Sequence, residues 1–168
     1  LTLKVTVANN PPVADNDTAT TAYDTNVDIL ASTGDTDIDG SINLASIDLD
    51  PTTPLTNDAT FTVANEGTYT ANANGTVTFN PLSTFSGTTT PVNYTIEDAT
   101  GANSNVATLT VTVANNPPLA DNDTATTAYD TNVDILASTG DTDIDGSINL
   151  ASIDLDPSTP LTNDATFT

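Results

Sequence analysis

The stretch ATLTVTV, residues 107–113, has an apolar side chain at every second position and threonine between them. Successive side chains of a β-strand point to opposite faces, so this pattern predicts a strand with one buried face and one exposed face. The same alternation occurs in NVDIL (26–30), SIDLD (46–50) and VNYTIED (92–98). Short alternating strands separated by turn residues, with no helical stripe, predict an all-β fold built as an antiparallel β-sandwich.

One hairpin is predicted in more detail, within GTYTANANGTVTFNP at residues 67–81. A two-residue Asn-Gly turn would place Tyr69 opposite the polar Asn80. A three-residue loop at residues 73–75, with its glycine in the left-handed region, instead pairs Tyr69 with Phe79. Because a shift of one residue turns every side chain of a strand to the other face, the three-residue loop is favoured.

The chain repeats itself almost without change. The segment that begins at Asn9 returns at Asn115, 106 residues later, and residues 9–62 differ from 115–168 only as Val13/Leu119 and Thr52/Ser158. LTLKVTVA at the start likewise matches ATLTVTVA at the end of the full copy. This predicts a window on a tandem array. Its parts are the last strand of a preceding repeat (1–10), a complete repeat (11–114) and the first half of the next (115–168). This half is expected to be disordered, or to be completed by another chain or by residues outside this window.

Composition excludes several classes of function. The chain has 23 acidic residues, Lys4 as its one cation and a formal net charge of -22, so nucleic acid and anionic membrane surfaces are not expected partners. There is no cysteine and no histidine, which removes disulfides, thiolate metal sites and the commonest general base. Asp48 and Asp50 are a carboxylate pair with no pocket implied, and the chain is not expected to be an enzyme.

From Asp15 to Val113 the repeat resembles the CshA-type fibril repeats and their relatives, which are immunoglobulin-like or cadherin-like tandem domains of giant bacterial surface adhesins. The resemblance is carried by DTATTAYDTNVDIL, DTDIDGS, EGTYTANANGTVTFNPLSTFSG and TPVNYTIEDATGANSNVATLTVTV. It implies an immunoglobulin-like sandwich and an extracellular, cell-surface location. Such repeats occur in fibrillar adhesins, calcium-rigidified secreted adhesins and gliding-motility filaments. The implied role is that of a spacer whose partners are neighbouring repeats, with a host or environmental surface contacted through regions outside these residues.

The loop GDTDIDGS, residues 34–41, is a candidate calcium site. Asp35, Asp37 and Asp39 match the first half of an EF-hand loop, but its twelfth position is Ser46 rather than glutamate. Three carboxylates with backbone carbonyls suit Ca²⁺, which accepts six to eight oxygens in irregular geometry. The alternative is a solvated acidic turn. The second copy of the loop has the same aspartates: Asp141, Asp143 and Asp145.

The junction NNPPVADND, residues 9–17, is a second candidate. Its two prolines stiffen the chain, and Asp15 and Asp17 follow directly. The loop bearing Asp98 is expected to approach this junction, where an ion shared between neighbouring domains would cancel repulsion. The alternative is a polar linker whose side chains cap turns. The copies one period later are Asp121 and Asp123.

Two further questions bear on function. An intramolecular isopeptide bond needs a lysine, but Lys4 is replaced by Thr110 one period later, so no such bond recurs. The alternative function is a ligand-binding β-sandwich module for carbohydrate or another surface, which needs exposed aromatic side chains. Tyr23 and Phe85 are the aromatic residues not already assigned to core-facing strands. The spacer is therefore the favoured interpretation.

Overall fold

A computed structural model describes residues 2–53, 56–155 and 157–158, and the chain divides into two compact units, Leu1–Asn115 and Asn116–Thr168. The strands of the described residues all lie in the first unit. They are β1 (Asp17–Thr21), β2 (Val27–Ile29), β3 (Thr60–Val63), β4 (Gly67–Ala71), β5 (Val77–Pro81), β6 (Gly87–Thr88), β7 (Val92–Tyr94) and β8 (Ala107–Val113).

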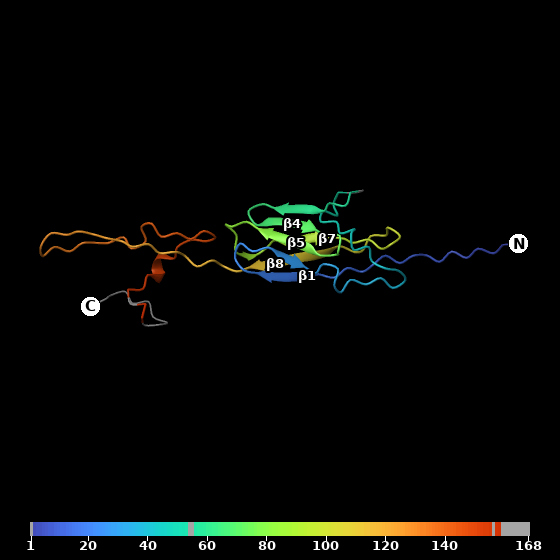
Figure 1. Cartoon of the computed structure of the whole chain (residues 1–168), viewed down its shortest axis with the longest axis horizontal. Helices are drawn as coiled ribbons and strands as arrows, with labels where there is room; N and C mark the ends of the chain where they lie inside the picture. The colour runs from blue at the N-terminus through green and yellow to red at the C-terminus, as the bar shows by residue number, and fades with distance from the viewer. Residues whose placement is uncertain (1, 54–55, 156, 159–168) are drawn as a thin grey trace. The chain divides into compact units, whose positions relative to one another are not determined.

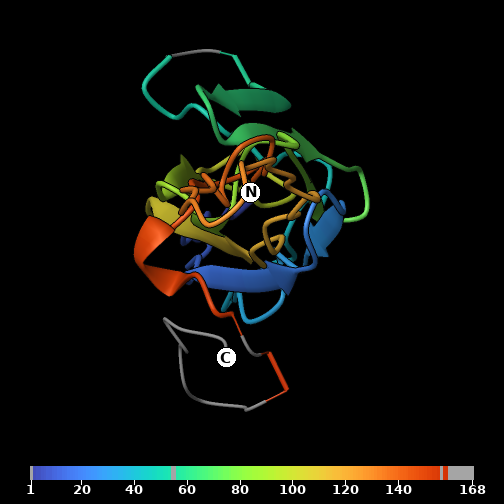
Figure 2. The same cartoon turned by 90° about the vertical axis from the view of Figure 1, so that its left-hand side faces the viewer.

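The strands form two sheets, as an all-β sandwich requires. One sheet has the order β2-β5-β4-β3, and in the other β8 pairs with β1 on one side and with β6 and β7 on the other. Figure 1 shows β4 and β5 over β1 and β8. In the end-on view of Figure 2, β1 (blue) and β3 (green) lie on opposite sides of the sandwich. The predicted all-β fold class is confirmed.

Strand β8 is the centre of its sheet, and its alternation is as predicted. Leu109, Val111 and Val113 are buried, whereas Thr112 is exposed. Its pairing with β6 and β7 is antiparallel, but its pairing with β1 is parallel, from Asp17 opposite Leu109 to Thr21 opposite Val113. The sheet is therefore mixed, a detail that the local pattern of β1 did not indicate.

The predicted hairpin register is confirmed. Tyr69 lies opposite Phe79 in the pairing of β4 with β5, and their ring centroids are 4.5 Å apart. The loop is closed by the amide of Asn72, which donates to the carbonyl of Thr76 at 2.8 Å. Gly75 has φ +84°, a left-handed conformation that glycine adopts without strain. Both aromatic rings are fully buried in the core as a result.

The segment SIDLD differs from the prediction of a strand. Ile47 and Leu49 are 2% and 1% exposed, so the apolar alternation was interpreted correctly for burial. The backbone, however, makes only an isolated bridge, in which Asp48 and Thr95 exchange hydrogen bonds of 2.9 and 3.1 Å. Alternation reports which side chains are buried, whereas a ladder also needs a continuous neighbouring strand.

The second unit has little regular structure. Its described residues contain one 3-10 helix, η1 (Leu150–Ser152), and an isolated bridge between Leu119 and Thr142. Several apolar side chains that would be buried in a complete repeat are exposed here, including Ile135 at 53% and Leu155 at 46%. Throughout the described part of the chain, no helix is long and apolar enough to cross a membrane.

Candidate functional site

The hydroxyl of Tyr94 joins three segments of the complete repeat. Tyr94 ends β7, and its side chain crosses the core to the start of β1 and the loop after β2. The hydroxyl oxygen is 2.8 Å from the carbonyl of Ala31, 2.9 Å from the carbonyl of Asp15 and 3.0 Å from a carboxylate oxygen of Asp17. Asp35 approaches it at 3.3 Å. The contacts connect the first and second halves of the repeat.

This cluster of Tyr94, Asp15, Asp17 and Asp35 holds more acceptors than protons. A tyrosine hydroxyl carries one proton, so it satisfies only part of the oxygen atoms around it. Burial, helped by repulsion from Asp15 and Asp35, raises the pKa of Asp17 to about 6. Burial also raises the pKa of Asp35, and burial together with both carboxylates raises the pKa of Tyr94 well above its ordinary value. The cluster is an oxygen-rich site with uncompensated negative charge.

The cluster makes stability depend on pH. Because the folded pKa of Asp17 is about 6 and its ordinary value is 3.8, ionisation opposes folding, and stability falls as the pH rises from about 4 to about 6. In a metal-free buffer, we expect the free energy of unfolding to be about 1 kcal/mol higher at pH 5 than at pH 7, since water screens a half-exposed carboxylate. Urea unfolding followed by circular dichroism at both pH values measures this.

Replacing the carboxylate tests its assignment. Asp17→Asn is expected to raise stability at pH 7 and to flatten the difference between pH 5 and pH 7. Asp24 lies in an exposed turn outside the cluster, so Asp24→Asn is the matched control and should leave the pH difference unchanged. If Asp17→Asn keeps the full pH dependence, its carboxylate is not the group that titrates.

The three aspartates of the acidic loop, residues 34–41, make hydrogen bonds to three different parts of the chain. Asp35 accepts a hydrogen bond from the amide of Asp15 at 3.0 Å, in addition to its approach to Tyr94. One carboxylate oxygen of Asp37 faces the amide of Gly40 at 3.2 Å, within its own loop. Asp39 turns outward and accepts from the amide of Asn10 at 3.1 Å. The structure therefore joins Asp35 to the junction aspartates rather than to Asp37 and Asp39.

The second copy of the loop repeats this arrangement. Asp141 accepts from the amide of Asp121 at 2.9 Å, and Asp145 accepts from the amide of Asn116 at 2.9 Å. Asp37 and its copy Asp143 each have a buried carboxylate oxygen with no hydrogen-bond partner among the described residues. In that same part of the chain, no three acidic side chains are already arranged to hold a metal ion.

Asp98 reaches the junction, as predicted, through Asn9. The carboxylate of Asp98 is 2% exposed. One of its oxygens accepts from the amides of Thr100 and Ala102 at 2.8 and 2.9 Å, and the other accepts from the side-chain amide of Asn9 at 2.6 Å. The hydrogen bonds from the Ala102 backbone and from Asn9 lower the pKa of Asp98 well below its ordinary value. Asp98 is therefore an ionised group that is already saturated with donors.

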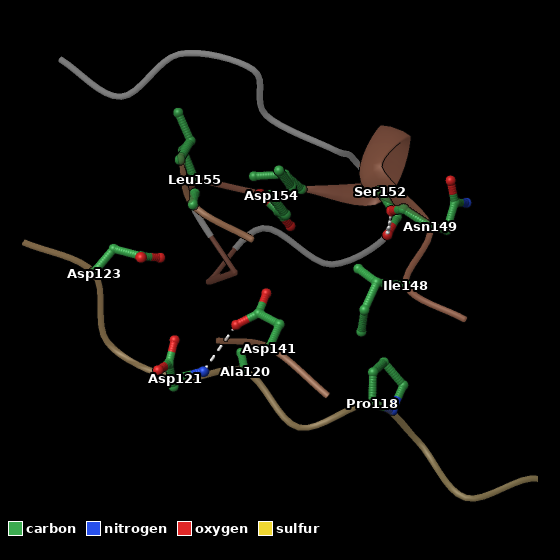
Figure 3. Close-up of a pocket in the computed structure, with 12 residues that line it drawn as sticks. Pro118, Ala120, Asp121, Asp123, Asp141, Ile148, Asn149, Ser152, Asp154 and Leu155 are labelled. Atoms are coloured by element: carbon green, nitrogen blue, oxygen red, sulfur yellow. Dashed lines mark hydrogen bonds between the residues drawn. The ribbon is translucent and has the colours of Figure 1, made fainter. Parts of the chain in front are cut away.

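A groove in the second unit is an unfilled core. Figure 3 shows its lining, in which the amide of Asp121 donates to Asp141 and the side chain of Asp123 lies nearby. Its apolar walls include Ala137 and Leu155, and the residues one period earlier, Ala31 and Leu49, are buried. In the complete repeat, the space beside Ala31 is occupied by Tyr94. The groove is where the second half of a repeat packs, so it offers no support for a separate ligand site.

Tyr23 and Phe85, the aromatic residues of the complete repeat that the sequence did not assign to core-facing strands, do not form an exposed platform. The hydroxyl of Tyr23 donates to the carbonyl of Ser83 at 2.8 Å, and Phe85 is partly buried against the core. Sequence reasoning did not anticipate the role of the Tyr94 hydroxyl. The available signal was a tyrosine, rather than phenylalanine, at a core position of a chain rich in aspartate.

Comparison with known proteins gives one result. Residues 12–113 match the family model described as the surface adhesin CshA repetitive domain. Neither the search of curated proteins nor the search of solved structures found a match.

Proposed function

The chain belongs to the family of CshA surface adhesin repeats, and on that premise we propose that it is a spacer in the stalk of a large bacterial adhesin. Membership in a surface adhesin family implies a cell-surface location and supports a structural role as a repeat domain. Neighbouring repeats of the same chain are its expected partners. Each copy adds reach without adding a new activity, which explains why near-identical copies follow one another.

The parallel pairing of β1 with β8 is the observation that carries this proposal. The chain enters the sandwich before Asp17 and leaves it after Val113, and the two strands run in the same direction side by side. Entry and exit therefore lie at opposite ends of the strand pair. A pull on both ends loads the hydrogen bonds from Asp17–Leu109 to Thr21–Val113 together, in shear, rather than one at a time.

A spacer is tested by its length. Chains with one, two and four complete repeats are expected to grow by the same increment per copy, measured by small-angle X-ray scattering. The matched comparison replaces the exposed Pro11 in every copy (Pro11→Gly) and leaves the buried Pro12 in place, which should preserve the fold of each repeat but lower the increment because glycine restores backbone freedom. A maximum dimension that does not rise with copy number would refute a spacer role.

Calcium is the second part of the proposal. The residues that would hold it are Asp15, Asp17 and Asp35: the carboxylates of Asp17 and Asp35 approach the Tyr94 hydroxyl, and the side chain of Asp15 lies beside that of Asp35. All available donors are oxygens, which is the donor type that Ca²⁺ prefers. The cation would offset both the burial of the Asp17 carboxylate and its repulsion by Asp15 and Asp35, which together raise its pKa, and would draw the entry of β1 toward the acidic loop.

A further inference from the structure

The chain segment that leads into the repeat, residues 9–13, is held against the acidic loop at two points. The amide of Asn10 lies 3.1 Å from a carboxylate oxygen of Asp39. Three residues later, Val13 and Thr36 exchange backbone hydrogen bonds of 2.8 and 2.9 Å. Pro12, between the two points, is fully buried. The segment therefore runs antiparallel to the loop and is fixed along its length.

The two prolines explain why the acidic loop bonds to the backbone amide of Asn10. Proline has no backbone N–H, so the segment offers no backbone donor between Asn10 and Val13. The amide of Asn10 is thus the last donor before the chain enters the sandwich. A carboxylate acceptor makes this hydrogen bond stronger than one between neutral groups. The side chain of Asn9 adds a second polar contact, to Asp98.

The same contacts occur independently one period later. The amide of Asn116 donates to Asp145 at 2.9 Å, and Leu119 exchanges hydrogen bonds of 2.8 and 2.9 Å with Thr142. These residues belong to the second unit, which has no counterpart of Asp98 within the sequence. The hydrogen bonds between the acidic loop and the incoming segment therefore form without the contact to Asp98 and without a complete sandwich.

We propose that each repeat carries a binding site for the Asn-Asn segment that precedes it, formed by Asp39 of the acidic loop and Asp98 of the loop before β8. This inference rests on the spacer role, and it assigns the stiffness of each joint to hydrogen bonds between the incoming chain and the repeat. Asp39 and Asp98 already have donors, so this contact does not depend on a metal ion. Asp39 and Asp98 hold the incoming chain at the joint between repeats, whereas Asp15, Asp17 and Asp35 belong to the cluster around the Tyr94 hydroxyl.

Amide hydrogen exchange in the 168-residue chain tests the site residue by residue. Asp39→Ala is expected to accelerate exchange of the Asn10 amide by up to about tenfold, which is the range allowed by the loss of one hydrogen bond. The Asn116 amide should be unchanged, since its acceptor is Asp145. Asp145→Ala should give the reverse pattern, so each variant is the control of the other. All rates should be the same in calcium and in chelator.

The outcomes separate this site from the spacer role. The proposed site for the Asn-Asn segment is refuted if Asp39→Ala leaves the Asn10 exchange rate unchanged in a chain that melts normally. The spacer role is not affected by that result. If Asp39→Ala prevents folding of the first unit, Asp145→Ala measures the same contact in the second unit, where an unchanged Asn116 rate refutes the proposal. If the exchange rate of either amide changes with calcium but not with removal of its acidic acceptor, a metal ion rather than this hydrogen bond holds the joint, and the proposal is refuted.

Discussion

Replacing Tyr94 with alanine is expected to lower the free energy of unfolding by about 3–5 kcal/mol, as truncation of a large buried aromatic residue does. A small domain is stable by only about 5–15 kcal/mol, so a loss of this size removes a large share of the margin. The side chain of Tyr94 is fully buried, and its hydroxyl contacts Ala31, Asp15 and Asp17. Its loss opens a cavity and also separates β7 from the entry of β1. Urea unfolding followed by circular dichroism measures the change.

Two variants show which part of the side chain matters. Tyr94→Phe keeps the ring and removes the hydroxyl, and it is expected to cost about 1–2 kcal/mol because buried acceptors lose their donor. Tyr129, which is 99% exposed, supplies the matched control, and Tyr129→Ala should leave the unfolding transition in place. If Tyr94→Ala unfolds at the same urea concentration as the parent chain, the hydroxyl cluster does not connect the two halves of the repeat.

Calcium is expected to produce the second large effect. Extracellular calcium modules bind with dissociation constants of about 10⁻⁴–10⁻³ M, so 10 mM calcium should stabilise one such site by roughly 1.4–2.7 kcal/mol. A domain of about 100 residues would then melt about 5–15 °C higher than in chelator. The physical reason is that the cation offsets the charge of Asp15, Asp17 and Asp35, which oppose one another in the folded repeat.

Differential scanning calorimetry in calcium, magnesium and chelator measures this effect. Magnesium at the same concentration should stabilise less, because it demands a strict octahedral arrangement. Asp17→Asn should remove most of the calcium response, whereas Asp24→Asn, in an exposed turn, should keep it. A melting transition that is identical in all three buffers would show that calcium does not stabilise the repeat. The spacer role would then stand without a bound metal ion.

Much of the fold follows from local sequence pattern. The alternation in residues 107–113 predicts the buried face of β8, and matching apolar faces predict the register of Tyr69 with Phe79. Both inferences succeed because side-chain direction in a strand depends on a period of two residues. The repeat and the family resemblance likewise follow from the amino-acid sequence alone, and residues 12–113 match the same family.

The candidate site was only partly predictable. The sequence places three aspartates in the acidic loop, but the structure directs Asp35 to the Tyr94 hydroxyl, Asp37 to its own loop and Asp39 to the incoming chain. Each direction depends on the loop backbone and on segments that are distant in sequence. Spacing between acidic residues does not report these directions, because a carboxylate is oriented by the donors around it.

By itself, the sequence determined an all-strand repeat, its period, the inward faces of its main strands and a large net negative charge. Only the tertiary structure decided that β1 lies parallel to β8, that Ile47 and Leu49 are buried without a continuous strand, and that Tyr94 meets the junction aspartates. Alternation is a local property, set by the backbone of each strand. The choice of neighbour joins residues about ninety positions apart and depends on how both sheets close over one core.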